Sequence, residues 1–382
     1  MRISFHSDAF ASAYWHFKKS LEWAGLEFCG SVMDYRALTI AIVLSVVWML
    51  PSASAEESSP IKIAFIAGPD SREYAQHEHN GGLLFLADYL ERFVSEKEIW
   101  QDGRKAPKII TKVFCDVRPD DPAFADPFVE NADVLVVFAD GAQCYPLAGH
   151  TPLLYRMKNA GKGFVVLHFA LCATQTITAE PPLERSLDEK FIREAIGGVY
   201  ETFHSINPFF TAEVEVVSGH PIARGVGPFA IWDEWYYNMR FINDLCTDEI
   251  LDPSRDTIVK AILKTVPPDA TRQRPDGAHS GNPYVRSRTG KPEILAWAIE
   301  RQDGGRGFGF TGGDQHVNWA HPDFRKVILN GIVWVAGLDI PQQGIATPSP
   351  SLEELLEHLK QPNAWSSDRE QSVRAMIDDW NR

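Results

Sequence analysis

The sequence of 382 residues has few cysteines, little positive charge and no long hydrophobic run, and each shortage argues against a class of protein. Its five cysteines include no C-x-x-C pair, which argues against a zinc finger or a thioredoxin-like redox site. The 37 Lys and Arg stand against 51 Asp and Glu, so the net charge is −14. This balance, without a basic run, argues against nucleic acid and anionic membranes as partners. For four cysteines we expect small buried side chains, and their pairing stays open: Cys115, Cys144, Cys172 and Cys246.

The longest apolar run, residues 37–50, is shorter than the roughly 20 residues that a membrane-spanning helix needs. It follows Arg36 and precedes the small residues Ala53-Ser54-Ala55. A basic residue, a short apolar run and a small-residue cleavage site are typical of a secretory signal peptide. We therefore expect translation to begin at Met33, cleavage before Glu56, and a secreted or periplasmic protein without a stable membrane span. Membrane anchoring by an uncleaved signal is the alternative.

Apolar runs alternate with helical patterns over residues 56–340, which we expect to form one domain. Runs without polar alternation predict strands that are covered on both faces, as in parallel sheets. The pattern predicts an α/β fold, a doubly wound, mostly parallel sheet sandwich. The predicted strands are Ile61–Ala67, Lys108–Val117, Asp133–Phe138, Phe164–Leu167, Thr257–Thr265, Glu293–Ile299 and Arg306–Thr311, and the predicted helices are Gly82–Val94, Pro152–Ala160 with Thr151 as N-cap, and Phe324–Ala336.

Three regions depart from this alternation. Cys172–Pro228 is a long insertion with few strand signals, and an irregular segment of that length inside a domain is usually functional. Val266–Pro292 is a loop rich in Pro, Gly and Arg. Residues 341–382 form a separate C-terminal region, with a Pro/Ser-rich linker and a peripheral helix at Leu352–Gln361.

Several motifs, in order along the chain, resemble those of the ThuA-like family, which is named for a trehalose-utilisation protein. The resemblance extends from Ile61 to Gly337. It implies a fold similar to class I glutamine amidotransferases and a role in carbohydrate metabolism. The motifs are HEHNGG (77–82), GKGFVVLHFAL (161–171), GGVYETFHSINP (197–208), HPIARGVGPFAIWDEWYYNMRF (220–241) and GFGFTGGDQHVNWAHPDFRKVILNGIVWVAG (307–337).

The sequence departs from the amidotransferases at the position of their nucleophile. That nucleophile is a cysteine on a strained turn directly after a strand. Here the strand FVVL leads into His168, and Cys172 lies four residues further on. An imidazole cannot replace the thiol, so we do not expect glutaminase activity. It can ligate a metal or transfer a proton.

Histidines follow four of the predicted strands. In an open parallel sheet, ligands bind beyond the carboxyl ends of the strands, so these side chains are expected to converge on one crevice. We assign catalytic roles to His168, His316 and Glu234, and metal ligation to His79, His168, Glu234 and His316. For three other histidines we expect structural roles: His150 as a surface residue, His220 as a turn residue and His321 as an initiator of the last helix.

Carboxylates and aromatic rings adjoin at Asp233–Tyr237, a combination that suits a sugar or polyol. The alternative is a strand whose rings, those of Trp235 and Tyr237 in particular, face the core. We assign substrate binding to His77, Glu201, His204, Asp233, Trp235, Tyr236 and Asn318.

Two chemistries remain open for these residues. A divalent metal, zinc in particular, takes imidazole nitrogens and carboxylates and activates water or a carbonyl. Without a metal, the same histidines act as general acid and base. Either would serve a hydrolase, isomerase or lyase that acts on a keto-sugar or disaccharide derivative. A non-catalytic carbohydrate-binding or accessory protein is the alternative, and the oligomeric state stays open.

Overall fold

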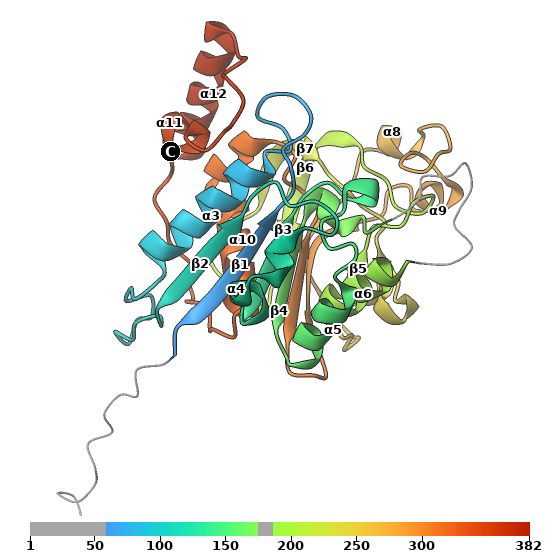
Figure 1. The fold of residues 1–382 in the computed structure, drawn as a ribbon. Helices are drawn as coiled ribbons and strands as arrows, with labels where there is room; N and C mark the ends of the chain where they lie inside the picture. The colour runs from blue at the N-terminus through green and yellow to red at the C-terminus, as the bar shows by residue number, and fades with distance from the viewer. Residues whose placement is uncertain (1–58, 175–185) are drawn as a thin grey trace, which may run out of the picture. The chain divides into compact units, whose positions relative to one another are not determined.

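The computed structural model describes residues 59–174 and 186–382. The predicted signal peptide and its cleavage site lie outside these residues. A nine-stranded sheet forms the centre of the domain, in the order β2-β1-β3-β4-β11-β10-β9-β6-β7 (Figure 1). A separate two-stranded antiparallel sheet consists of β5 (Gly198–Val199) and β8 (Arg240–Phe241).

The first five strands of the sheet are parallel to one another. Their order corresponds to 2-1-3-4-5, the flavodoxin-like arrangement, in which the order of successive strands reverses between β1 and β3. The predicted fold class, a doubly wound and mostly parallel α/β sheet, is therefore confirmed. These strands are β1 (Ile61–Ala67), β2 (Ile109–Phe114), β3 (Val134–Phe138), β4 (Gly163–Leu167) and β11 (Arg306–Phe310).

The other four strands extend the sheet in antiparallel fashion. They are β10 (Glu293–Glu300), β9 (Val259–Thr265), β6 (Phe209–Val216) and β7 (Phe229–Glu234). Along most of β6, exposed and buried residues alternate, as in a strand with one face toward solvent.

Helices cover both faces of the parallel half. Alternate residues of each strand point to opposite faces. In β1, Ile63 and Phe65 therefore join one apolar core, while Ala64 and Ile66 join the other. The first core lies under α3 (His79–Phe93) and α10 (Pro322–Val335), and the second under α4 (Pro127–Glu130), α5 (Thr151–Asn159) and α6 (Leu187–Ile196).

The remaining helices are short, except the last. They are α7 (Thr247–Leu251), α8 (Asp269–Arg272), α9 (Pro283–Ser287), α11 (Leu352–Leu356), α12 (Ser367–Trp380) and the 3-10 helices η1 (Pro122–Ala125), η2 (Ala142–Cys144), η3 (His168–Leu171), η4 (Pro221–Ala223), η5 (Ile242–Asp244) and η6 (His316–Ala320). Within the described residues, no helix combines the length and the apolar character that a membrane span requires.

Several expectations about local structure are wrong. Cys172–Pro228 is not an irregular insertion, because it contains α6, β5 and β6. Polar residues alternate with apolar ones in β6, a period-two signal typical of an antiparallel strand. Thr151 does not cap α5: the helix begins at Thr151, whose hydroxyl donates to Asp188 at 2.7 Å.

The C-terminal region and the cysteines also differ from expectation. The predicted helix Leu352–Gln361 ends at Leu356, and the longer α12 was not predicted. The described cysteines are all free. Cys172 is buried, whereas Cys115, Cys144 and Cys246 are exposed, so the expectation of burial is right for one of the four.

Candidate functional site

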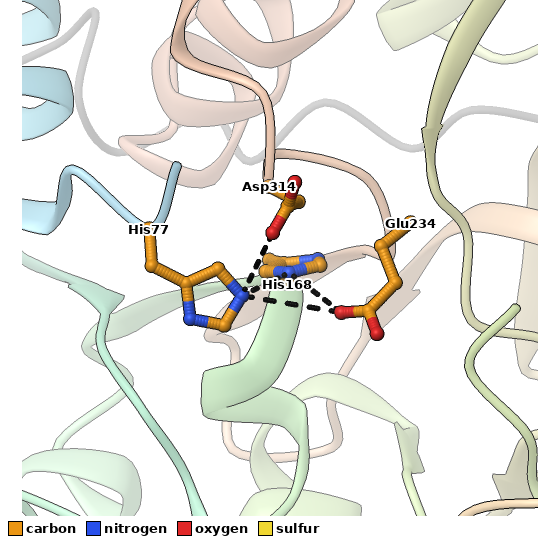
Figure 2. Close-up of side chains that lie close together, drawn as sticks. All are labelled: His77, His168, Glu234 and Asp314. Carbon is orange, nitrogen blue, oxygen red and sulfur yellow. Dashed lines mark hydrogen bonds and ion pairs between the residues drawn. The ribbon is translucent and has the colours of Figure 1, made fainter. Parts of the chain in front are cut away.

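Four ionisable side chains converge at the carboxyl edge of the parallel strands: His77, His168, Glu234 and Asp314 (Figure 2). We call them the four-residue cluster. His77 follows β1, His168 follows β4, Asp314 follows β11, and Glu234 ends β7. All four are buried, and one ligand atom from each lies within 4.8 Å of the other three. Segments far apart in the sequence therefore meet at the edge where α/β sheets bind ligands.

The two imidazoles of the cluster face each other through their Nε2 atoms, which lie 3.1 Å apart. Asp314 Oδ1 lies 3.2 Å from His77 Nε2. Glu234 Oε2 lies 3.5 Å from His168 Nε2 and 3.9 Å from His77 Nε2. Two nitrogens and two carboxylate oxygens thus surround one small space.

The opposite nitrogen of each ring contacts an oxygen that accepts a hydrogen bond. His168 Nδ1 donates to the carbonyl oxygen of Thr311 at 2.9 Å, and His77 Nδ1 donates to Asp140 Oδ1 at 2.8 Å. In a neutral imidazole with its proton on Nδ1, Nε2 carries a lone pair. Two such lone pairs would repel each other at 3.1 Å, so the space between the rings favours a proton or a metal cation.

The charges around His77 favour its cationic form. Burial alone would lower its pKa, but hydrogen bonds to Asp140, Asp314 and Glu234 raise the pKa to about 11. Burial likewise would raise the pKa of Glu234, but the two imidazoles lower it to about 2. Both values follow from one cause, a buried site in which carboxylates surround the imidazoles.

Backbone pairing between two loops positions His77 and Asp314. The His77 N–H donates to the Asp314 carbonyl at 3.0 Å, and the His316 N–H donates to the Ala75 carbonyl at 3.0 Å. Gln76 and Gln315 form a β-bridge between these bonds. The loop after β1 and the loop after β11 are therefore held side by side.

Asp233 holds the loop after β11 through hydrogen bonds to its backbone. Its carboxylate accepts hydrogen bonds from the Gly313 N–H at 2.8 Å and the Gln315 N–H at 3.2 Å. A Cβ on Gly312 would lie only 2.7 Å from the Trp235 ring, and Gly313 has a φ of 124°. Both glycines are thus required by close packing or conformation. Asp233, predicted to bind substrate, is buried and instead positions the loop that carries Asp314.

His168 occupies the turn after β4 with a φ of 52°, a sparsely populated conformation for a residue with a side chain. Tyr236 stacks on its ring, with centroids 4.6 Å apart. The Tyr236 hydroxyl also donates to Glu234 Oε2 at 3.0 Å. Tyr236 therefore orients both a histidine and a carboxylate of the cluster.

The predicted set of metal ligands is assembled differently from what the sequence suggested. His168 and Glu234 lie together, but with His77 and Asp314 in place of His79 and His316. The ring of His316 is turned away and bonds through Nε2 to the Leu355 carbonyl at 2.7 Å. This hydrogen bond to α11 holds the ring away from the cluster, and the sequence pattern does not reveal it.

His79 belongs to a neighbouring group with His77 and Asp140. Its Nδ1 donates to the Pro69 carbonyl at 2.8 Å, and its Nε2 lies 3.7 Å from Asp140 Oδ1. Burial lowers the pKa of His79 to about 3, so the ring is neutral. His79 therefore lies beside Asp140, the hydrogen-bond partner of His77, and outside the four-residue cluster.

Other residues predicted to bind substrate make contacts within the protein or lie outside the cluster. Trp235 is fully buried and packs against Phe310 and Phe324, as in the core-facing alternative. Asn318 donates to the Trp232 carbonyl at 3.0 Å. Glu201 pairs with Arg240 at 2.9 Å, and neither it nor His204 belongs to the cluster.

Of the three structural roles expected for histidines, those of His220 and His321 are confirmed. His220 caps η4, and His321 caps α10 by accepting from the Asp323 N–H at 3.3 Å. His150 is not a plain surface residue, because it is half-buried and its ring stacks on Phe124 with centroids 4.0 Å apart.

Two hollows adjoin the cluster, and both are lined by Phe209 and Glu234. One, of about 400 Å³, also has Asn207, Thr271 and Arg274 in its wall. The other, of about 300 Å³, is lined by Asp314 and Arg72 among others. Two larger hollows, of about 700 and 720 Å³, contain none of the four cluster residues. A ligand would therefore reach the cluster through the two smaller hollows.

Sequence analysis missed Asp140, Asp314, Arg274 and His279. Asp140 and Asp314 each follow a predicted strand within a few residues, so the rule that found the histidines could have found them. No such signal exists for Arg274 and His279, which lie in the loop between β9 and β10. His279 Nδ1 lies 3.1 Å from the buried Tyr200 hydroxyl, and the two rings stack with centroids 5.4 Å apart.

Comparison with known proteins places the chain in a family. Among solved structures, it is similar to a ThuA-like protein of Bacteroides uniformis, with 14% identity, a TM-score of 0.46 and coverage of 76% of this chain and 96% of that one. A ThuA-like protein of Parabacteroides merdae has 14% identity and a TM-score of 0.42, with coverage of 72% of this chain and 90% of that one. PurLQS of Thermotoga maritima has 8% identity and a TM-score of 0.36, with coverage of 72% of this chain and 98% of that one. No curated protein matches the chain significantly. The family model ThuA, described as trehalose utilisation, matches residues 108–335, so the chain belongs to the ThuA family.

Proposed function

We propose that the four-residue cluster binds one divalent metal ion and that the protein uses this site to act on a carbohydrate. The observation that carries the proposal is the 3.1 Å approach of the two Nε2 atoms, each from a ring whose Nδ1 is committed to an oxygen. Ligating histidines usually donate their other N–H to a carboxylate or carbonyl in this way. Asp140 and the Thr311 carbonyl are those partners here.

The donor set suits zinc. Zinc binds imidazole nitrogen at about 2.0–2.1 Å in tetrahedral sites, so ligand atoms of one ion lie about 3.3 Å apart. Three separations in the cluster, of 3.1, 3.2 and 3.5 Å, are close to that value, and a fourth, between Glu234 Oε2 and His77 Nε2, is longer at 3.9 Å. Two imidazoles make a site for calcium or magnesium less favourable, since these ions prefer oxygen ligands.

The proposed reaction is hydrolysis, isomerisation or elimination on a keto-sugar or disaccharide derivative. A divalent cation in this site would polarise a sugar carbonyl or lower the pKa of water. Asp140 and the Thr311 carbonyl fix the two imidazole orientations, and Tyr236 fixes Glu234. Glutaminase activity is not proposed, because Cys172 is fully buried and its burial raises the thiol pKa to about 12.

We also propose that the protein is exported, on the strength of the apolar run at residues 37–50 and the small residues before Glu56. Intact-mass measurement and N-terminal sequencing of the protein purified from the periplasm or the culture medium test this. A mature chain that begins at Glu56 is the expected result. Retention of the apolar run would instead favour an anchored protein.

Elemental analysis of the purified protein tests the metal site. We expect about one equivalent of zinc or a similar transition metal per chain, lost in His77→Ala and in His168→Ala. His220→Asn is the matched control, because it removes an imidazole from a capping position outside the cluster and retains a capping side chain. A metal-free protein that cannot be loaded with zinc, cobalt or manganese would contradict the proposal. A proton on His77 would then fill the space between the rings, in an acid–base site.

A further inference from the structure

Two exposed aromatic rings lie on the same face of the β6–β7 hairpin as Glu234. Phe209 is directly opposite Glu234 in the register, and Trp232 lies two residues before it. Directly opposite residues of an antiparallel pair, and alternate residues of one strand, share a face. The two rings stack with centroids 5.1 Å apart, although 45% of Phe209 and 46% of Trp232 are exposed. An apolar platform therefore adjoins the cluster.

Arg274 lies in the wall of the 400 Å³ hollow, together with Phe209 and Glu234. Its Nη1 is buried and has no hydrogen-bond partner. Two nearby arginines form ion pairs with carboxylates, Arg272 with Glu293 and Arg286 with Asp276, although Arg272 Nε is likewise buried without a partner. A buried guanidinium N–H without an acceptor is costly, which points to an acceptor on a ligand.

The second hollow lined by Phe209, of about 300 Å³, contains another cation. Arg72 is exposed there, and no ion pair or hydrogen bond of its side chain is found among the described residues. The chain as a whole carries a net charge of −14, so two unpaired guanidinium groups beside one carboxylate cluster run against the general charge. They favour a ligand that brings negative charge to the mouth of the site.

We propose that Phe209 and Arg274 form a subsite for an acidic sugar, with the pyranose ring on Phe209 and its carboxylate on Arg274. The inference rests on the proposed function, since it names the substrate class of the same site. An aromatic ring matches the apolar face of a pyranose. A planar guanidinium matches a carboxylate with two parallel hydrogen bonds, which a neutral hydroxyl cannot accept equally well. The ring of such a ligand would lie next to Glu234 and hence to the cluster.

Calorimetric titration with methyl glucuronide and methyl glucoside, which differ in one carboxylate, tests the subsite. We expect the glucuronide to bind roughly tenfold or more tightly than the glucoside, as for a hydrogen bond to a charged group. Arg274→Gln should abolish that difference, and Arg274→Lys should retain part of it. Phe209→Ala should weaken the binding of both glycosides. Arg104→Gln is the control, because it removes the same charge from the turn between α3 and β2, at the opposite edge of the sheet.

Three results would overturn the subsite: equal affinities for the two glycosides, no effect of Arg274→Gln, or binding of acetate as tight as that of glucuronide. The last would mean an anion site without sugar recognition. Metal content is measured on the same samples. Full metal occupancy with no preference for glucuronide would refute the subsite and leave the metal proposal intact. Absent metal with a retained preference would refute the metal and leave the subsite.

Discussion

The parallel and antiparallel halves of the sheet contribute differently to the site. The parallel half is covered on both faces and supplies His77, His168 and Asp314 from the turns beyond its strands. The antiparallel half supplies Glu234 and, on its exposed face, the rings of Phe209 and Trp232. Most of the inner ligand set thus comes from the half covered on both faces, and the surface that would contact a substrate comes from the half with an open face. The comparison suggests that the two halves can be altered separately.

The largest expected effect concerns metal binding by the parallel half. His168→Ala should weaken zinc binding by more than roughly 100-fold. Loss of a residue that only orients a ligand costs up to about 100-fold, and loss of the ligand itself should cost more. His316→Ala should leave stoichiometric zinc, because that ring bonds to the Leu355 carbonyl outside the cluster. Competition with a chromophoric chelator measures both affinities, with circular dichroism to check folding. Equal losses in the two variants would restore His316 to the ligand set.

The two halves should also differ in what a truncation costs in stability. Leu135 is fully buried in β3, so Leu135→Ala should lower the free energy of unfolding by about 2–5 kcal/mol. Trp232→Ala removes a half-exposed ring from β7 and should cost only about 0.5–1.5 kcal/mol, the value of an aromatic pair. Urea titrations of both variants give the comparison. A cost for Trp232→Ala as large as that for Leu135→Ala would mean that the platform is structural.

A smaller effect is expected when an outer partner of the cluster is changed. Asp140→Asn keeps an acceptor for His77 Nδ1 but removes the negative charge that favours this orientation. Zinc affinity should fall by about 10- to 100-fold. The same chelator assay measures it, and Asp133→Asn, at the amino end of β3, is the control. An unchanged affinity would show that Asp140 does not act through His77.

A modest effect is expected for the pH dependence of the contact between α10 and the antiparallel half. The His321 ring caps α10 and packs on Phe229 of β7. Burial lowers its pKa to about 4 from an ordinary value of 6.5. Between these values the unfolded chain binds the proton first, so stability should fall as the pH drops from 6.5 toward 4.

Replacing His321 by Asn isolates this contribution, because Asn keeps a capping oxygen without a titrating ring. The variant should lose about 1–2 kcal/mol less stability than the parent between pH 7 and pH 5. Urea unfolding at the two pH values measures the difference. Parallel losses in parent and variant would assign the acid sensitivity to other groups, such as His220, whose pKa burial also lowers to about 4.

Sequence patterns predicted the parallel half better than the antiparallel half. The continuous apolar runs of β1, β3 and β4 are unambiguous, because strands covered on both faces contain little else. In β6, polar residues on the open face interrupt the apolar ones, and the strand was read as part of an irregular insertion. For α12, only two buried residues mark the packed face, so its pattern is weak.

The sequence by itself determined which strands of the parallel half are buried and that His77 and His168 follow the carboxyl ends of two of them. This follows from local hydrophobic pattern and from the rule that parallel strands share an edge. Only the tertiary structure decided which imidazoles face one another. The orientation of each ring depends on an acceptor distant in the chain: the Thr311 carbonyl for His168, Asp140 for His77 and the Leu355 carbonyl for His316. Such partners are set by packing between elements, which no local pattern encodes.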